Sequence, residues 1–367
     1  MTPEEEQAVA YHVRELAKLL YKDADASQTP MTNLGEIEAA VREQIQKHVT
    51  PEMGGFFIET VTGTTEGYPR QLKSILGTLP LTSEQANQLG VSKGSQLSPY
   101  LEMCCLRISA NVSYAHATED VALLTGVRVS PKTQQRLVQR QSFAHPTVQL
   151  TDAVNQVSLD GGQMRFVTPK GEPSEWKQYK AVRLDTDGIG MAWFQDNAAL
   201  VNWVQDQPLQ SPLYCIGDGH PGIWNLLSQL VEDDQRIEIL DWYHLMENLH
   251  KVGGSLQRHA QARQLLWRGQ VDAAIAVFED CALEQAKCFQ NYLREHRHRI
   301  VNYEYFQAEG LCAIGSGDVE SWVKQIDRRI QLSGASWNPE HAPQVLAHRC
   351  AYLNGSLDPQ HLFLSRR

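Results

Sequence analysis

The order of strand-like and helix-like segments between residues 155 and 251 constrains the fold more than any other feature of this sequence. The stretch "NQVSLDGGQMRFV" alternates apolar and polar residues and predicts a strand that turns at Gly161-Gly162. The next stretch, "YKAVRLDTDGIGMAWF", predicts a hairpin with Asp187-Gly188 in its turn. Together these segments predict the antiparallel part of a sheet.

Helices then alternate with short strands. The pattern predicts a helix over 197–205, a buried strand over 214–216, a helix from Pro221 to about Leu230, and a strand over 237–240 that leads into another helix. Hairpins followed by this alternation predict an α/β fold, with helices packed on a mixed sheet.

Helical patterns dominate the rest of the chain. Apolar residues recur at helical spacing over residues 1 to about 50, and short helices are predicted again from 81 to 140. A loop-rich stretch between them is marked by four glycines, Gly54, Gly55, Gly63 and Gly67. Residues 248 to about 309 have the composition of helices and no strand pattern. A last helix begins at "IGSG", where Ser316 can serve as its cap and Glu320 falls in its first turns.

Composition bounds the classes of function. The 367-residue chain has a formal net charge of −10, which counts against nucleic-acid binding judged on bulk charge alone. Basic clusters at 126–140 and 294–299 are nevertheless compatible with DNA binding. The chain has no apolar run of about 18 residues and its start is acidic, so we expect a cytoplasmic protein without a membrane partner. Its seven cysteines lack C-x-x-C spacing, which argues against a disulfide framework or a zinc ribbon.

The stretch 113–140 has the pattern of a helix-turn-helix. Thr118 can cap a first helix that runs to Leu124, Gly126 makes the turn, and Ser130 caps a second helix that begins with Pro131. One broad face of the second helix would carry donors for base edges or phosphates, namely Lys132, Gln135, Arg136, Gln139 and Arg140. A plain helical hairpin with a solvated polar face explains the pattern equally well.

Three carboxylates stand out by their positions. Asp160 lies on the first strand, Asp218 ends a later strand between two glycines, and Glu320 lies near a helix start. Strand ends and nearby helix starts converge on one crevice in an open α/β sheet, where three carboxylates would repel one another without a cation. Oxygen ligands favour Mg²⁺ or Mn²⁺, so a site for metal-dependent phosphoryl transfer is one interpretation. The other interpretation is structural: the two aspartates lie in turns, and the glutamate favours a helix N-terminus electrostatically.

Five stretches, in this order, closely resemble bacterial insertion-sequence transposases of the ISKra group, relatives of the Mutator-like transposases. They are "SLDGGQMR", "CIGDGHPGIWNL", "ILDWYHLMENLHKV", "IVNYEYFQAEGLCAIGSGDVES" and "LSGASWNPEHAPQVLAHRCAYLNG". The likeness covers about residues 113–356, because "TGVRVSPKTQQRLVQR" also resembles the segment that precedes the catalytic core in that family.

The resemblance implies a ribonuclease-H-like fold with a DDE triad of Asp160, Asp218 and Glu320, which would hold two Mg²⁺ or Mn²⁺ ions. "DWYH" resembles an aspartate-x-x-histidine signature, and we expect His244 near the site as a DNA or phosphate contact. The implied regions are a mostly helical N-terminal region (1–112), a helix-turn-helix-like DNA-binding segment (113–150), the first part of the catalytic core (151–247), a helical insertion (248–310) and the second part of the core with the glutamate (311–367).

The function expected from this resemblance is DNA transposition, with metal-dependent cleavage and strand transfer of an insertion sequence. The DNA contacts expected outside the triad are Arg128, Lys132, Gln135, Arg136, Gln139, Arg140 and His244. The partners would be the element ends and target DNA, bound by a homodimer or larger assembly that joins the nucleoid. The alternative is a catalytically decayed or repurposed transposase-derived DNA-binding protein. Many relatives carry paired C-x-x-C motifs upstream of the core, whereas the corresponding stretch of this chain, residues 62–91, contains no cysteine.

Overall fold

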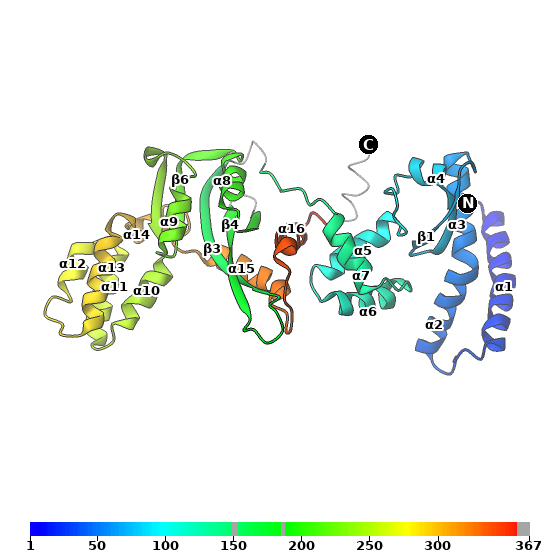
Figure 1. Cartoon of the computed structure of the whole chain (residues 1–367), viewed down its shortest axis with the longest axis horizontal. Helices are drawn as coiled ribbons and strands as arrows, with labels where there is room; N and C mark the ends of the chain where they lie inside the picture. The colour runs from blue at the N-terminus through cyan, green and yellow to red at the C-terminus, as the bar shows by residue number, and fades with distance from the viewer. Residues whose placement is uncertain (149–152, 185–187, 358–367) are drawn as a thin grey trace. The chain divides into compact units, whose positions relative to one another are not determined.

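The computed structural model describes residues 1–148, 153–184 and 188–357, and these residues form two compact units. The N-terminal unit comprises Met1–Leu137 together with Leu357, and the sheet unit comprises Val138–Ser356. Figure 1 follows both units along the chain. Within the described ranges, no helix combines the length and apolar character that a membrane span requires.

Helices make up most of the N-terminal unit, as the sequence predicts. They are α1 (Pro3–Ala26), α2 (Leu34–Gln44), the π-helical turn η1 (Ile45–Val49), α3 (Thr50–Thr62), α4 (Ser83–Gln88), α5 (Pro99–Ser109), α6 (Tyr114–Thr125) and α7 (Pro131–Arg140), whose last residues belong to the sheet unit. A β-hairpin of β1 (Pro69–Ser74) and β2 (Gly77–Thr82) was not predicted.

The predicted loop at Gly54 and Gly55 is wrong, because both residues lie inside α3. A Cβ at Gly54 would come within 2.6 Å of the Leu79 side chain on β2. The glycine therefore allows the hairpin to approach the helix closely and does not break the helix. Close packing of this kind is invisible in a local pattern.

The helix-turn-helix pattern corresponds to α6 and α7, with Gly126 between them at a φ of 74°. The predicted cap is wrong, because Ser113 accepts the cap hydrogen bond from His116 N at 3.2 Å. Thr118 is buried inside α6, where its hydroxyl donates to Val129 O at 2.8 Å. Ser130 caps α7 as predicted, by accepting a hydrogen bond from Thr133 N at 3.2 Å.

The sheet unit contains a five-stranded mixed sheet with the order β5-β4-β3-β6-β7. The strands are β3 (Val154–Phe166), β4 (Glu175–Leu184), β5 (Gly190–Phe194), β6 (Leu209–Gly217) and β7 (Arg236–Leu240). β3, β4 and β5 pair antiparallel, whereas β6 is parallel to β3 and β7 is parallel to β6. The predicted α/β class with a mixed sheet is confirmed.

The predicted turn at Gly161-Gly162 is wrong, because β3 continues through both residues and pairs with β4 along its length. Gly162 lies opposite Tyr179, and a Cβ at Gly162 would overlap the Tyr179 ring. The glycine makes room for an aromatic ring that crosses the strand. β4 and β5 form the predicted antiparallel pair, but Asp187 lies outside the described residues.

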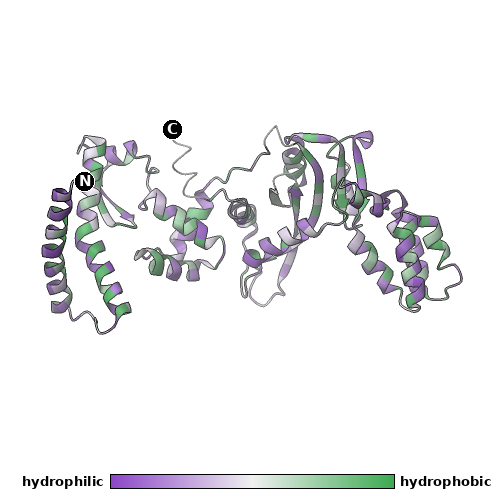
Figure 2. Ribbon diagram, turned by 180° about the vertical axis from the view of Figure 1, so that it is seen from behind, coloured by the Kyte–Doolittle hydropathy of each residue, from purple (hydrophilic) through white to green (hydrophobic). Residues whose placement is uncertain are grey.

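Helices cover both faces of this sheet. They are α8 (Asn197–Gln205), α9 (Pro221–Leu227), α15 (Gly317–Ile330) and α16 (Ala342–Leu353). Trp322 of α15 lies against Gly190 of β5, whereas Trp203 of α8 contacts Trp193, three residues further along the same strand. Alternate residues of a strand face opposite sides, so α15 and α8 cover opposite faces. Figure 2 shows the resulting apolar character of the central strands.

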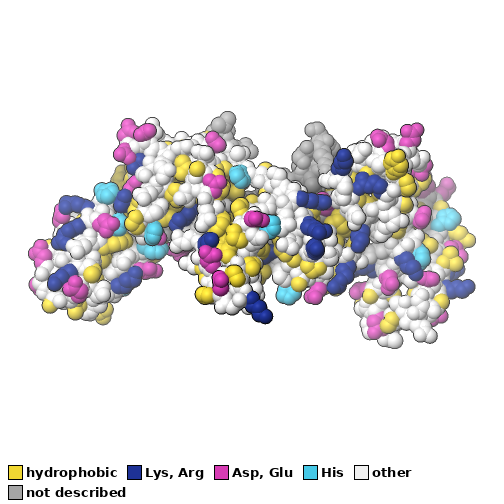
Figure 3. Space-filling view, in the orientation of Figure 1, with side chains coloured by type: hydrophobic (Ala, Val, Ile, Leu, Met, Phe, Trp, Pro, Cys, Tyr) yellow, Lys and Arg dark blue, Asp and Glu magenta, His cyan; other side chains and the backbone are white. Residues whose placement is uncertain are grey.

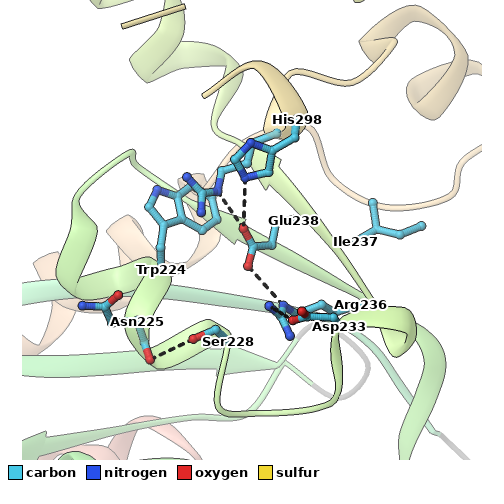
Figure 4. Close-up of a pocket in the computed structure, with 9 residues that line it drawn as sticks. Trp224, Asn225, Ser228, Asp233, Arg236, Ile237, Glu238 and His298 are labelled. Atoms are coloured by element: carbon cyan, nitrogen blue, oxygen red, sulfur yellow. Dashed lines mark hydrogen bonds and ion pairs between the residues drawn. The ribbon is translucent and has the colours of Figure 1, made fainter. Parts of the chain in front are cut away.

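A helical body follows β7, as the sequence predicts. It contains α10 (Trp242–Lys251), α11 (Leu256–Trp267), α12 (Val271–Ala276), α13 (Glu284–Glu295), the 3₁₀ turn η3 (Arg297–Arg299) and α14 (Tyr303–Ala308). Buried Tyr303 joins it to the sheet by donating to Leu240 O at 2.7 Å. Glu238 of β7 adds a second link, because it accepts hydrogen bonds from Arg236 and Arg299 at 3.1 Å and 2.6 Å (Figure 4).

Candidate functional site

Asp160 and Asp218 come from neighbouring parallel strands. Ser158 of β3 lies opposite Ile216 of β6. Asp160 comes two residues after Ser158, and Asp218 comes two residues after Ile216. Alternation along a strand therefore directs both carboxylates to the same face of the sheet. Tyr179, opposite Gly162 and on this face, donates from its hydroxyl to Asp327 of α15 at 2.8 Å, so α15 covers the face to which Asp160 points.

Gly217 and Gly219, on either side of Asp218, are each required for a different physical reason. A Cβ at Gly217 would lie 3.0 Å from the Trp224 ring, because α9 folds back over the strand end. Gly219 adopts a φ of 101°, which side chains disfavour, and lies beside Tyr292 and His296 of the helical body. Asp218 itself accepts a hydrogen bond from His220 N at 2.8 Å. The local backbone thus holds Asp218 at the strand end and leaves room for α9 and α13.

Glu320 lies in the first turns of α15, as predicted, but Ser316 does not cap that helix with its side chain. The Ser316 backbone N–H and hydroxyl both donate to Asp241 Oδ2. Asp241 is fully buried, and its Oδ1 accepts from Tyr243 N at 2.6 Å and His244 N at 2.9 Å at the start of α10. One carboxylate therefore joins the N-terminus of α10 to that of α15.

His244 lies between carboxylates. Its Nδ1 is 3.6 Å from Asp241 Oδ1 and 3.8 Å from Glu320 Oε1, which are ion-pair distances and too long for hydrogen bonds. Its contact with Asp241 raises the pKa of His244 to about 9, although burial opposes the shift, and Asp218 contributes further. Burial would raise the pKa of Asp241, but the polar contact with the His244 ring, together with hydrogen bonds from Ser316 and the His244 N–H, outweighs it and lowers that pKa to about 2.

Asp160 lies within electrostatic reach of the other two predicted carboxylates. Burial raises the pKa of Asp160, and the negative charges of Asp218 and Glu320 raise it further. His244 opposes the shift, as does the hydrogen bond that Asp160 Oδ1 accepts from Gly161 N at 2.6 Å. Asp160, Asp218 and Glu320 are each half-buried, so solvent reaches the cluster. We call these three residues the acidic cluster.

One set of the described residues brings three possible ligand atoms for a cation together. Ligand atoms of Asp241, His244 and Glu320 lie within 4.8 Å of one another. Both oxygens of Asp241 already accept two hydrogen bonds each, and a protonated His244 has no lone pair to offer. Asp160 and Asp218 do not belong to that group of ligand atoms. The negative charges of Asp218 and Glu320 nevertheless raise the pKa of Asp160, and a hard divalent cation would relieve that repulsion.

Several residues at the site were not singled out from the sequence. The sequence pointed to Asp241 only within the "DWYH" stretch and to Ser316 only as a helix cap. The Asp-x-x-His spacing was the available signal, because positions i and i+3 share one side of a helix turn. Tyr292 carried no such signal, since α13 is far from Asp218 in sequence although its ring reaches Gly219.

The predicted DNA-contacting residues fall in two places. Arg128, Lys132, Gln135, Arg136 and Arg140 are exposed on α7 or just before it, and Gln139 is half-buried. On the face shown in Figure 3, Lys and Arg side chains gather over the region of α5 to α7. His244 lies beside the acidic cluster instead. In the stretch "NYEYF", Tyr303 is buried, whereas Tyr305 is 53% exposed.

Comparison with protein families gives no match to any family model, and comparison with curated proteins gives no match either.

Proposed function

We propose that this protein is a DNA transposase of the DDE type, with Asp160, Asp218 and Glu320 as its catalytic carboxylates. The observation that carries the proposal is that the charges of Asp218 and Glu320 both act on Asp160, although the three residues come from two parallel strands and a later helix. The sequence resemblance had selected the same three residues. Residues that only form turns or favour a helix start would have no reason to lie within reach of one another's charge.

The order β5-β4-β3-β6-β7 supports a ribonuclease-H-like core for this transposase. Asp160 lies on the central strand, Asp218 follows the adjacent parallel strand, and α15 brings Glu320 over the same face. The carboxyl ends of parallel strands are where α/β sheets place their ligands, and Asp218 follows such an end.

The acidic cluster would hold two Mg²⁺ or Mn²⁺ ions, which supply activation of an attacking oxygen and stabilisation of a leaving oxygen in phosphoryl transfer. The protein's own contribution is positioning and charge. The Asp241–Ser316 contact fixes Glu320 relative to the sheet, and protonated His244 offers a positive charge to a DNA phosphate beside the cluster.

The exposed basic face of α7 supports a separate role in gripping DNA, either element ends or target. We further propose a cytoplasmic protein that joins the nucleoid when bound to DNA and acts as a homodimer or larger assembly there.

The test is Mg²⁺-dependent cleavage and strand transfer on DNA that carries the ends of the native element. Asp160→Asn, Asp218→Asn and Glu320→Gln should each reduce product at least a hundredfold and leave the fold intact, because each removes one carboxylate charge from the cluster. Chelation of the metal by EDTA should abolish product in the same way. Asp318→Asn is the matched control, since Asp318 is exposed in the first turn of the same helix. If the Asp218→Asn variant carried out strand transfer at the wild-type level, the Asp218 carboxylate would be excluded from the mechanism.

A catalytically decayed DNA-binding protein is the second candidate, and the net charge of −10 together with the missing upstream cysteines favours it. Mn²⁺-dependent nicking separates the two candidates. Nicked product from the wild type supports the enzyme, whereas tight binding of uncut DNA supports the decayed form.

A further inference from the structure

A second feature of the sheet unit lies next to the acidic cluster. A pocket opens between α10, α11 and α14, and we call it the aromatic pocket. Its described lining comprises Trp242, Tyr243, Leu249, His250, Leu256, His259, Ala260, Arg263, Gln264, Trp267, Gln307 and Ile314. The pocket therefore has one wall on the helix that begins at Asp241 and another on the helical body.

The chemistry of this pocket differs from that of the chain as a whole. None of the described residues that line it is acidic, although the chain carries a net charge of −10. Arg263, Gln264 and His250 are exposed at its rim and present nitrogen donors. A lining of this kind suits a ligand that carries acceptor atoms and belongs to a negatively charged molecule.

Aromatic rings supply the pocket's apolar surface. Trp242 and Trp267 pack edge to face with centroids 4.8 Å apart, and buried Tyr303 stacks behind Trp267 at 6.2 Å. This packing fixes the half-buried Trp267 before any ligand arrives. Tyr243 adds a ring that is 60% exposed. Rings held in advance with open faces are stacking platforms for flat ligands.

Tyr243 connects the aromatic pocket to the acidic cluster. Its backbone N–H donates to Asp241, and its ring covers Gly315, where a Cβ would lie 2.6 Å from the ring. Gly315 immediately precedes Ser316 at the start of the helix that carries Glu320. A ligand stacked on Tyr243 thus lies beside the place where the proposed chemistry occurs.

Two further pockets among the described residues have different chemistry. In the pocket of Figure 4, Glu238 already pairs with Arg236 and Arg299, and the Arg299 guanidinium stacks on Trp224 at 4.3 Å, so its charges satisfy one another. The groove between α1, α2 and α3 is lined mainly by aliphatic side chains and offers few donors.

We propose that the aromatic pocket binds an unpaired base of the DNA strand whose phosphate lies at the acidic cluster. Stacking on Tyr243 and Trp267 would hold the base plane, while Arg263 and Gln264 would donate hydrogen bonds to its edge. This inference rests on the proposed function, because it requires DNA at the cluster. It adds that the protein recognises a base outside the duplex stack and so prefers distorted or single-stranded DNA at the cut site.

The test measures fluorescence anisotropy of a labelled DNA duplex with one unpaired adenine, and of the same duplex with an abasic residue at that position. Divalent ions are omitted, so catalysis does not affect the result. The wild type should bind the adenine form about tenfold more tightly than the abasic form, as expected for the loss of one stacked base. Cross-linking of an unpaired 5-iodouracil should map to Tyr243 or Trp267.

The informative variant is Arg263→Ala with Gln264→Ala, because both residues are exposed and their removal spares the packed rings. It should bind the adenine form less tightly and show a smaller preference over the abasic form, because the hydrogen bonds to the base edge are lost while the stacking rings remain. Arg268→Ala is the matched control, since Arg268 follows the same helix, is exposed and does not line the pocket. Tyr243→Phe should keep the preference, because it keeps the ring. Equal wild-type affinity for both DNAs would overturn the pocket proposal alone, whereas no binding of either DNA would overturn the proposed function with it.

Discussion

His244 lies within reach of two carboxylates, Asp241 and Glu320, and this environment sets its protonation. The polar contact with Asp241 raises its pKa from the ordinary value of 6.5 to about 9. We predict that the imidazole titrates near pH 9 in the NMR spectrum of the metal-free protein. In Asp241→Asn the pKa should fall towards 6.5, because the partner charge is gone. A midpoint near 6.5 in the wild type would contradict this assignment.

The raised pKa of His244 also makes the stability of the folded protein depend on pH. A pKa that is raised in the folded state stabilises the protein fully below pH 6.5, and that contribution disappears as the pH rises through about 9. The difference in unfolding free energy between wild type and His244→Gln should therefore be largest at pH 6 and shrink by pH 9.5.

Single residues were predictable to different degrees. Asp218 and Glu320 lie at a strand end and near a helix start, as their sequence contexts predict, whereas Asp160 lies inside β3 and not at its end. The resemblance, and not the local pattern, grouped the three. Asp241 could not be selected from its sequence context, because its role depends on Ser316, which meets it only through the packing of α10 against the start of α15. A hydrogen bond that joins distant segments leaves no trace in local spacing.

Within the strands, Gly162 determines how β3 and β4 fit together. Gly162→Ala would drive a methyl group into the Tyr179 ring and weaken the bond from Tyr179 to Asp327. We expect a loss of about 1–3 kcal/mol of unfolding free energy, the usual range for overpacking. Urea denaturation measures it. Gly317→Ala is the control, because a Cβ there would meet no atom within 4 Å. Equal stability of the two variants would show that Tyr179 moves aside freely.

Between helices, Asp241 acts as both a cap and a link. Asp241→Ala removes the cap of α10 and leaves the buried Ser316 N–H and hydroxyl without an acceptor. We expect a loss of about 2–4 kcal/mol, the sum of a cap and an unsatisfied buried donor. Asp196→Ala removes only an exposed cap, of α8, and should cost about 1 kcal/mol in the same urea experiment. Equal losses would mean that the link to α15 contributes nothing.

Elements were predicted well where local patterns decide them. The helix over 197–205 has the predicted bounds, and the helical body after β7 is confirmed. The errors at Gly54 and Gly162 share one cause, since each glycine makes room for a side chain from another element. The hairpin of β1 and β2 was missed because β1 buries only Leu72 and Ser74, which is too few apolar residues for a strand pattern.

For the molecule as a whole, a net charge of −10 makes local basic surface decisive for any grip on DNA. Lys132→Ala with Arg136→Ala removes two exposed charges from α7. We predict weaker DNA binding, with the slope of log K against log salt reduced by about 1.8 if both residues contact phosphates. Lys287→Ala, on the exposed side of α13, is the control. An unchanged slope would favour the plain helical hairpin.

Topology could be predicted only in part. The pattern of hairpins followed by alternation indicated a mixed sheet, but the strand order and register depend on contacts between segments separated by several elements. The division into two units within α7 had no signal, because that helix continues across the boundary without a change in pattern.

The chain order of the acidic cluster has a consequence for synthesis. Asp160 and Asp218 leave the ribosome before the helical body, whereas Glu320 follows it on α15. A nascent chain therefore carries two of the three side chains throughout translation of the helical body, and β3 lacks its α15 cover during that time. The complete cluster can form only after α15 has emerged, so a ribosome-bound or prematurely terminated chain without that helix cannot assemble it.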